Sequence, residues 1–130
     1  MRLSLPILAS VCGLLLAAAP AAADPAARHS QCFFVNGFEN WKAPDARTIY
    51  IRVNLHRYYR LDLANSCSAL LMPDSHLITK WRGSSSVCSA LDWDLKVSQG
   101  FPGAATPCIV KTMTELTAEE AAAIPKKFKP

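Results

Sequence analysis

Apolar and polar residues alternate with a period of two along three stretches of the chain, residues 48–53, 57–63 and 91–97. The apolar positions are Ile49, Ile51 and Val53, then Tyr59, Leu61 and Leu63, then Leu91, Trp93, Leu95 and Val97. Successive side chains of a β-strand point to opposite faces, so each stretch predicts a strand with one buried and one wet face. This pattern is typical of antiparallel sheets. Shorter strand candidates are residues 32–35, 76–81 and 108–113.

The first two of these strands are close enough to form a hairpin. Registers that keep both apolar faces together pair residues of like parity. A loop of residues 54–56 places Tyr50 opposite Arg60, and in the same register Arg52 faces Tyr58. Sliding the loop by one residue would set Arg52 against Arg60, and facing like charges destabilise a sheet. We therefore expect the first register, with two tyrosine–arginine pairs on the outer face.

Two segments are predicted to be helical. Residues 64–72 lose the alternation, which indicates one or two helical turns that Asn65 or Ser66 caps and Pro73 ends. Near the end of the chain, Thr117–Glu120 has the sequence of a capping box, and Pro125 stops the helix that follows. Both helices are short, so the strands dominate the fold.

These elements predict an α+β, β-rich fold with a small twisted antiparallel sheet or partly open barrel, one short internal helix and a C-terminal helix. Residues 82–86 form a predicted flexible loop, and residues 98–107 a longer irregular loop rich in glycine and proline. Closing the sheet would hide its edges and make the first and last strands neighbours.

The N-terminus has the pattern of a secretory signal peptide. Arg2 precedes a long apolar stretch, and three alanines end at Ala23, where small residues permit cleavage. A retained membrane anchor is the alternative, but Pro20 and the alanines oppose it and no basic cluster follows. We predict cleavage after Ala23 and an exported protein, periplasmic or secreted, with no membrane span afterwards.

Cleavage divides the chain into a signal peptide (1–23), a flexible mature N-terminus (24–31), a single domain (32–124) and a basic tail (125–130). The net charge falls from +4 to +3, because Arg2 is lost. A nucleic-acid-binding protein would carry a denser basic surface, so no nucleic-acid partner is expected. The net charge of the mature chain indicates no other class of binding partner.

Four cysteines stay in the mature chain: Cys32, Cys67, Cys88 and Cys108. An even set in an oxidising compartment predicts two disulfides. Zinc is the competing interpretation, but the spacings contain no C-x-x-C pair. Three pairings are possible. We favour Cys67–Cys88 and Cys32–Cys108, because sheet closure would bring the first and last strands together.

Candidate catalytic chemistry is sparse, and we expect no catalytic, cofactor-binding or metal-binding residues. His29, His56 and His76 lie in predicted loops or turns without a partner at metal-ligand spacing. Asp92 and Asp94 share the wet face of one strand, as paired carboxylates do in acid–base sites. Exposed strands show the same alternation without function. Phosphate-binding, dinucleotide-binding, zinc-protease and nucleophile-elbow motifs are missing.

The frame "CFFVNGFENW…IYIRVNLHRYYRLDLANSC…VCSALDWDLKV…PCIVKTMTELTAEE" resembles a family of small exported proteobacterial proteins. That family is catalogued only as a domain of unknown function. The resemblance covers residues 32–122, and the four cysteines are its specific positions. It implies export and a disulfide frame, and it brings no assigned activity or catalytic residues.

Three functions compete. The first is a non-enzymatic binding or structural module, whose partner is a protein or cell-envelope component. Its contact surface would be Tyr50, Arg52, Tyr58 and Arg60. The second is an inhibitor of an exported enzyme that uses the loop 98–107. The third is a small hydrolase that uses Asp92 or Asp94 with His76.

Overall fold

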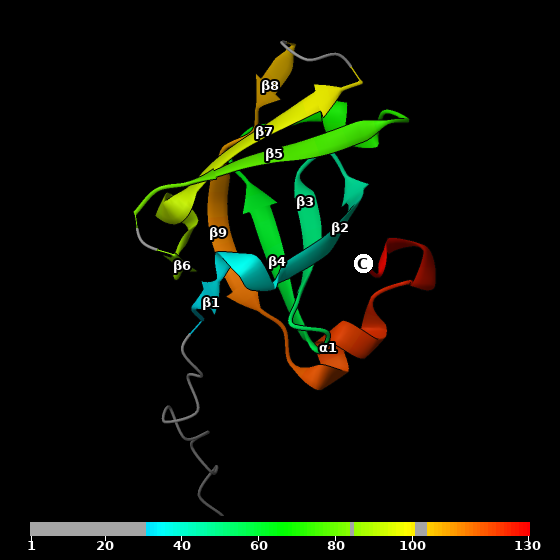
Figure 1. Ribbon diagram of the computed structural model, residues 1–130. Helices are drawn as coiled ribbons and strands as arrows, with labels where there is room; N and C mark the ends of the chain where they lie inside the picture. Colours follow the sequence, from blue (N-terminus) through cyan, green and yellow to red (C-terminus); the bar gives the residue numbers. More distant parts are fainter. Residues whose placement is uncertain (1–30, 84, 101–103) are drawn as a thin grey trace, which may run out of the picture.

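The computed structural model describes residues 31–83, 85–100 and 104–130. These residues form three antiparallel sheets and one α-helix near the C-terminus (Figure 1). The largest sheet has the order β2–β3–β4–β9, with strands Phe38–Asp45, Thr48–Val53, Arg57–Leu63 and Val110–Glu115. The second has the order β5–β7–β8, with strands Ser75–Trp81, Trp93–Gln99 and Ala105–Pro107. A small ribbon pairs β1 (Phe33–Phe34) with β6 (Ser86–Val87). The predicted β-rich antiparallel class is confirmed.

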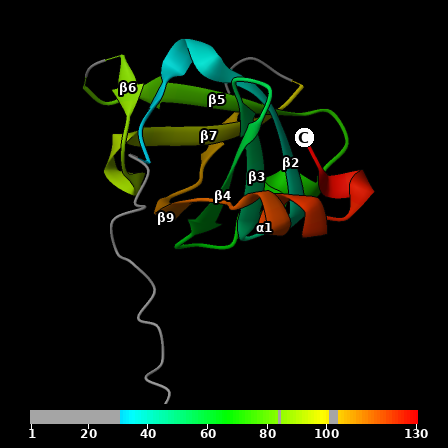
Figure 2. The same ribbon diagram turned by 90° about the horizontal axis from the view of Figure 1, so that it is seen from below.

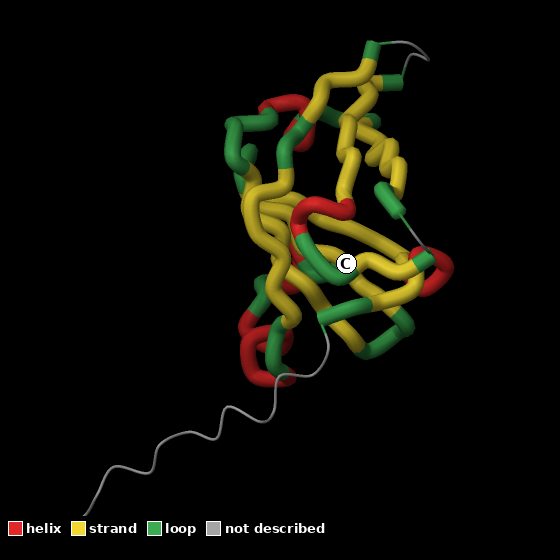
Figure 3. The backbone as a smooth tube through the Cα atoms, turned by 90° about the vertical axis from the view of Figure 1, so that its left-hand side faces the viewer, coloured by secondary structure: helices red, strands yellow, loops and turns green. Residues whose placement is uncertain are grey.

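The core lies between the two larger sheets, whose strands run across each other (Figures 1 and 3). Its floor is the apolar face of β3 and β4, where Ile49, Ile51, Tyr59 and Leu61 are fully buried. From the smaller sheet, β7 contributes the buried residues Trp93, Leu95 and Val97. The described strands do not close into a barrel, because β1 pairs with β6 and the four-stranded sheet ends at β2 and β9.

The β3–β4 hairpin has the predicted register. Tyr50 pairs with Arg60 and Arg52 with Tyr58. The loop turns through two residues with positive φ, Asn54 (48°) and Leu55 (66°). The Leu55 N–H donates a hydrogen bond to Glu39 Oε1 at 2.9 Å, which holds this unusual backbone conformation in place.

Strand β2 was not predicted, because its sequence does not alternate. Its register with β3 shifts between Phe38 and Asn40 and again between Lys42 and Asp45. Each irregularity breaks the period of two on which the prediction depended. Trp41 on this strand is partly buried against the core.

The third predicted strand begins two residues later than expected. Ala90–Asp92 form a 3₁₀ turn, η4, whose N-cap is Ser89, and β7 starts at Trp93. The prediction that Leu91 faces inward was therefore wrong, and its side chain is 82% exposed.

Both predicted helical segments are present. The internal one is a 3₁₀ helix, η3 (Ser68–Leu71), whose N-cap, Cys67, makes no side-chain cap. Asn65, predicted as a cap, accepts a hydrogen bond from the Ile109 N–H instead. Helix α1 (Ala118–Ala123) begins with the predicted capping box and ends before Pro125. The remaining 3₁₀ turns are η2 (Val35–Gly37) and η5 (Lys126–Phe128).

Two disulfides are present, Cys32–Cys88 and Cys67–Cys108, and the predicted pairing was wrong. That prediction assumed that the first and last strands are neighbours. Instead β1 pairs with β6, which sets Cys32 beside Cys88. Cys67 follows β4 and Cys108 precedes β9, and these two strands are paired. Each bridge thus joins positions that neighbouring strands bring together.

The described residues contain no helix long and apolar enough to cross a membrane. The predicted signal peptide (1–23) and His29 lie outside the described residues, as do residues 101–103 of the loop 98–107. Part of that loop is the strand β8, which pairs with β7.

Candidate binding groove

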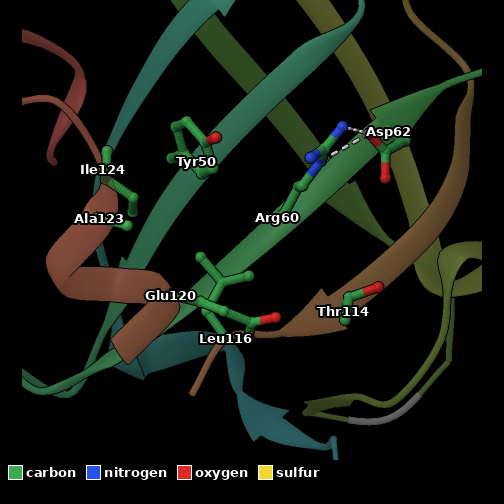
Figure 4. Close-up of a pocket in the computed structure, with 8 residues that line it drawn as sticks. All are labelled: Tyr50, Arg60, Asp62, Thr114, Leu116, Glu120, Ala123 and Ile124. Carbon is green, nitrogen blue, oxygen red and sulfur yellow. Dashed lines mark hydrogen bonds and ion pairs between the residues drawn. The ribbon is translucent and has the colours of Figure 1, made fainter. Parts of the chain in front are cut away.

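A groove of about 430 Å³ lies between the outer face of the four-stranded sheet and the C-terminal helix (Figure 4). Strands β3, β4 and β9 supply its floor, and the linker to α1, the helix and its C-cap supply one wall. The residues that line it are Tyr50, Arg60, Asp62, Thr114, Leu116, Glu120, Ala123 and Ile124.

The floor is polar because it is the face opposite the core. Arg60 lies between Tyr50 on β3 and Thr114 on β9, and it pairs with both. Asp62, two residues farther along β4, points to the same face and pairs with Thr112. The alternation that buries one face of β4 therefore also aligns the polar groups of the groove.

Arg60 and Asp62 form an ion pair on this floor (Figure 4). Asp62 Oδ1 accepts from Nε and Nη2 of Arg60, each at 2.8 Å. The hydrogen bond to Asp62 raises the pKa of the Arg60 guanidinium. Thr112 Oγ1 donates to the second carboxylate oxygen, Oδ2, at 3.1 Å. Both side chains stay more than a third exposed, so they are held in position and face the groove.

The wall depends on the capping box at the start of α1. Thr117 Oγ1 accepts from the Glu120 N–H at 3.2 Å, and Glu120 Oε2 accepts from the Thr117 N–H at 2.8 Å. The Leu116 N–H donates to the Tyr58 carbonyl at 2.8 Å, which ties the linker to β4. Ile124 is buried at the end of the helix. The wall thus combines a fixed helix start with apolar side chains.

The predicted contact surface is divided by the last residues of the chain. Tyr50 and Arg60 open onto the groove. Arg52 forms an ion pair with Glu39 at 3.0 Å and donates to the Pro130 carbonyl at 3.4 Å. The Lys129 ammonium lies 5.2 Å from the centre of the Tyr58 ring. We name these the open pair (Tyr50 and Arg60) and the covered pair (Arg52 and Tyr58).

The structure does not assemble the hydrolase residues. His76 pairs with Ser98 across β5 and β7, whereas Lys80 pairs with Asp94. Four residues of strand separate the two positions, roughly 13 Å. This spacing is far longer than the contact that acid–base catalysis needs.

Asp92 has a structural role instead. Its Oδ2 accepts hydrogen bonds from the backbone N–H groups of Cys88 and Ser89, each at 2.9 Å. These bonds lower the pKa of the Asp92 carboxyl. Asp92 thus completes the capping box of η4.

The histidines and acids of the described residues form no group of three or more metal-ligand side chains. His56 is exposed in the hairpin loop, and His76 is exposed on β5 rather than in a turn.

A family model described as a family of unknown function, DUF6491, matches residues 1–128. The chain belongs to this family. The membership confirms the expected assignment to a family catalogued only as a domain of unknown function. No curated protein and no solved structure matches the chain.

Sequence reasoning found only part of the groove of this DUF6491 protein. Tyr50 and Arg60 were named from the hairpin register. Asp62 carried the same signal, because it follows Arg60 on the wet face of β4. The wall residues carried no such signal, because their position depends on how α1 folds back onto the sheet.

Proposed function

We propose that this protein is an exported, non-enzymatic binding module, periplasmic or secreted, and that its ligand lies in the groove beside α1. The observation that carries the proposal is the open pair, Tyr50 and Arg60, on the floor of a 430 Å³ groove. Pockets of this size commonly hold small molecules or short polymer segments. Exposed tyrosine and arginine are enriched at binding surfaces.

The hydrogen bonds of the groove support a role in binding. Asp62 is held by Arg60 and Thr112, and Glu120 by the start of α1. Carboxylates fixed in this way are positioned to accept hydrogen bonds from a ligand. Fixed side chains also lower the ordering cost of binding.

Export is supported by the apolar, alanine-rich N-terminus and by the two disulfides, which persist in oxidising compartments. The ligand is then a protein or a component of the cell envelope. Fractionation of expressing cells tests this part of the proposal. Reduced protein in the cytoplasmic fraction would contradict export.

Binding is tested with the oxidised, isotope-labelled protein and a soluble envelope extract separated into protein and saccharide fractions. We expect one fraction to shift the backbone amide signals around Tyr50, Arg60 and Thr114. Tyr50→Ala should abolish the shifts, and the matched variant Tyr58→Ala should keep them. Shifts centred elsewhere, or no shift from any fraction, would overturn the proposal.

A further inference from the structure

The polar groups on the groove floor alternate between donors and acceptors. The Arg60 guanidinium donates, the Asp62 carboxylate accepts, and the Thr114 hydroxyl does both. Arg60 and Asp62 are already in contact at 2.8 Å, so a donor and an acceptor face the groove side by side. A pair of neighbouring sugar hydroxyls offers the complementary set, because each hydroxyl donates one hydrogen bond and accepts others.

The Tyr50 ring lies next to this pair and supplies a flat apolar surface (Figure 4). Sugar rings also have apolar faces, formed by their C–H groups, and these pack against aromatic rings. Leu116, Ala123 and Ile124 extend the apolar surface along the helix wall. The groove therefore offers one apolar contact and one row of hydrogen-bonding groups, as an amphipathic ring requires.

The charges of the lining oppose an anionic ligand. Arg60 is neutralised by Asp62, and Glu120 adds a further negative charge at the wall. A phosphate or an acidic polymer would approach a groove whose titratable lining groups sum to one negative charge. The carboxylates at this site therefore favour a ligand without negative charge.

A peptide strand is also disfavoured. Peptides that extend a sheet bind along a free strand edge. The groove instead covers the faces of β3 and β4, whose backbone groups are paired within the sheet. On the floor, side chains are therefore left to bind the ligand, and sugar hydroxyls match their donors and acceptors.

We propose that the groove binds a neutral oligosaccharide, with one sugar ring stacked on Tyr50 and its hydroxyls bonded to Arg60 and Asp62. This inference rests on the proposed binding function and adds the class of ligand. Thr114 contributes a third polar contact from β9.

The experiment is a calorimetric and amide-shift titration of the oxidised protein with chitohexaose, cellohexaose and maltohexaose. Oligogalacturonate and a mixed library of unstructured peptides are the comparison probes. We expect at least one neutral hexasaccharide to bind with a Kd tighter than about 1 mM. Its amide shifts should centre on Tyr50, Arg60 and Asp62.

Matched variants locate the contact. Tyr50→Ala should weaken binding about tenfold, because the stacking surface is lost, whereas Tyr50→Phe keeps the ring and the affinity. Asp62→Asn should also weaken binding, because a charged acceptor becomes neutral. Tyr58→Ala should bind as the parent protein does. Amide spectra that keep the dispersion of the folded protein in every variant would show that the loss of binding is local.

The outcomes separate the two proposals. If oligogalacturonate or peptides shift the groove amides and no neutral hexasaccharide does, the ligand class is wrong and the binding module stands. If a neutral hexasaccharide binds but Tyr50→Ala binds equally well, the groove is the wrong site. If neither the defined probes nor the envelope fractions shift the groove amides, both proposals fail.

Discussion

The open pair and the covered pair have the same residue types and the same cross-strand geometry, yet the fold uses them differently. Both face away from the core on β3 and β4. The covered pair lies under the last residues of the chain, and the open pair faces the groove. Figure 2 shows α1 on the face of the four-stranded sheet that points away from β5 and β7. A tyrosine–arginine pair on a strand is therefore structural or available for binding according to what distant residues cover it.

The covered pair gains its contacts from both ends of the domain. Glu39 comes from β2, which pairs with β3, and reaches Arg52. Lys129 and Pro130 arrive from the C-terminal segment after Pro125. Predicted as a basic tail, this segment includes η5 and lies against β2. Three contacts from outside the hairpin thus occupy one half of the predicted contact surface.

The largest expected effect on stability comes from removing the disulfide that ties β4, the strand of Arg60, to its neighbour β9. Cys67–Cys108 joins the end of β4 to the start of β9, and both sulfur-bearing residues are buried. The alanine double variant at these positions should lose about 4 kcal/mol of unfolding free energy from chain entropy and about 1 kcal/mol more from lost packing. Urea unfolding measures this loss, and the amide signals of Asp62 and Thr114 should shift.

The other disulfide supplies the control. Cys32–Cys88 closes a loop of 56 residues against 41, so chain entropy predicts a similar loss of about 4 kcal/mol. Cys88 is exposed, however, and the bridge holds the β1–β6 ribbon rather than the groove. Its removal should leave the groove amides unchanged. A larger loss of unfolding free energy on removal of Cys32–Cys88 would show that the burial of the cysteines does not decide which disulfide stabilises the protein more.

The second-largest expected effect is the pH dependence of stability due to Tyr59, whose side chain lies on the buried face of β4, opposite the two pairs. Tyr59 lies between Tyr58 and Arg60 in sequence but points into the core, fully buried. Burial first, and then the charge of Glu115, raises the pKa of Tyr59 from 10.0 to about 12. The unfolded chain releases this proton near pH 10, and the folded protein keeps it until about pH 12. The stability is therefore complete below pH 10 and falls between pH 10 and pH 12.

The loss due to Tyr59 should reach on the order of 2 kcal/mol near pH 12. Chemical unfolding at a series of pH values measures it against the Tyr59→Phe variant, in which this part of the decline disappears. Tyr50→Phe serves as the matched control and should keep the full decline. Parallel curves for the parent protein and Tyr59→Phe would show that the buried hydroxyl does not titrate as expected.

Local rules predicted the paired hairpin and the helix start, because the deciding residues lie close in sequence. Parity and the repulsion of Arg52 and Arg60 were enough to select the register of β3 and β4. The capping box at Thr117 was equally local. The disulfide pairing was not, because it depends on which strands become neighbours across the whole fold.

The same limit explains the missing strand and half of the groove. Bulges in β2 hide its alternation, so the strand that supplies Glu39 to Arg52 was missed. Nothing in the hairpin sequence states that Lys129 will reach Tyr58 or that Ile124 will line a groove above Tyr50. These contacts depend on packing between segments that are distant in the sequence, which residue spacing alone does not predict.

The third-largest expected effect comes from a truncation that exposes the covered pair. Removing residues 126–130 takes away Phe128, which is half-buried, and the buried Pro130. Their lost burial should cost about 1–2 kcal/mol of unfolding free energy. Tyr58 should also become more reactive toward a tyrosine-acetylating reagent, which mass spectrometry of peptides measures. Lys126→Ser keeps the segment in place and is the matched control. Unchanged Tyr58 reactivity after truncation would show that the segment does not cover it.

The smallest effect compares the two tyrosines directly. Tyr58→Ala removes the contact with Lys129 and the pairing with Arg52, so it should lower the unfolding free energy by about 1 kcal/mol. Tyr50→Ala also loses a cross-strand partner, but its ring faces the groove, so we expect about half that loss. Ligand binding should respond in the opposite order, with Tyr50→Ala defective and Tyr58→Ala intact. Urea unfolding and the amide-shift titration, applied to both variants, measure the two responses. If the two variants were equally destabilised and equally able to bind, the division of the surface into two functional halves would be wrong, because each tyrosine would then serve the sheet alone.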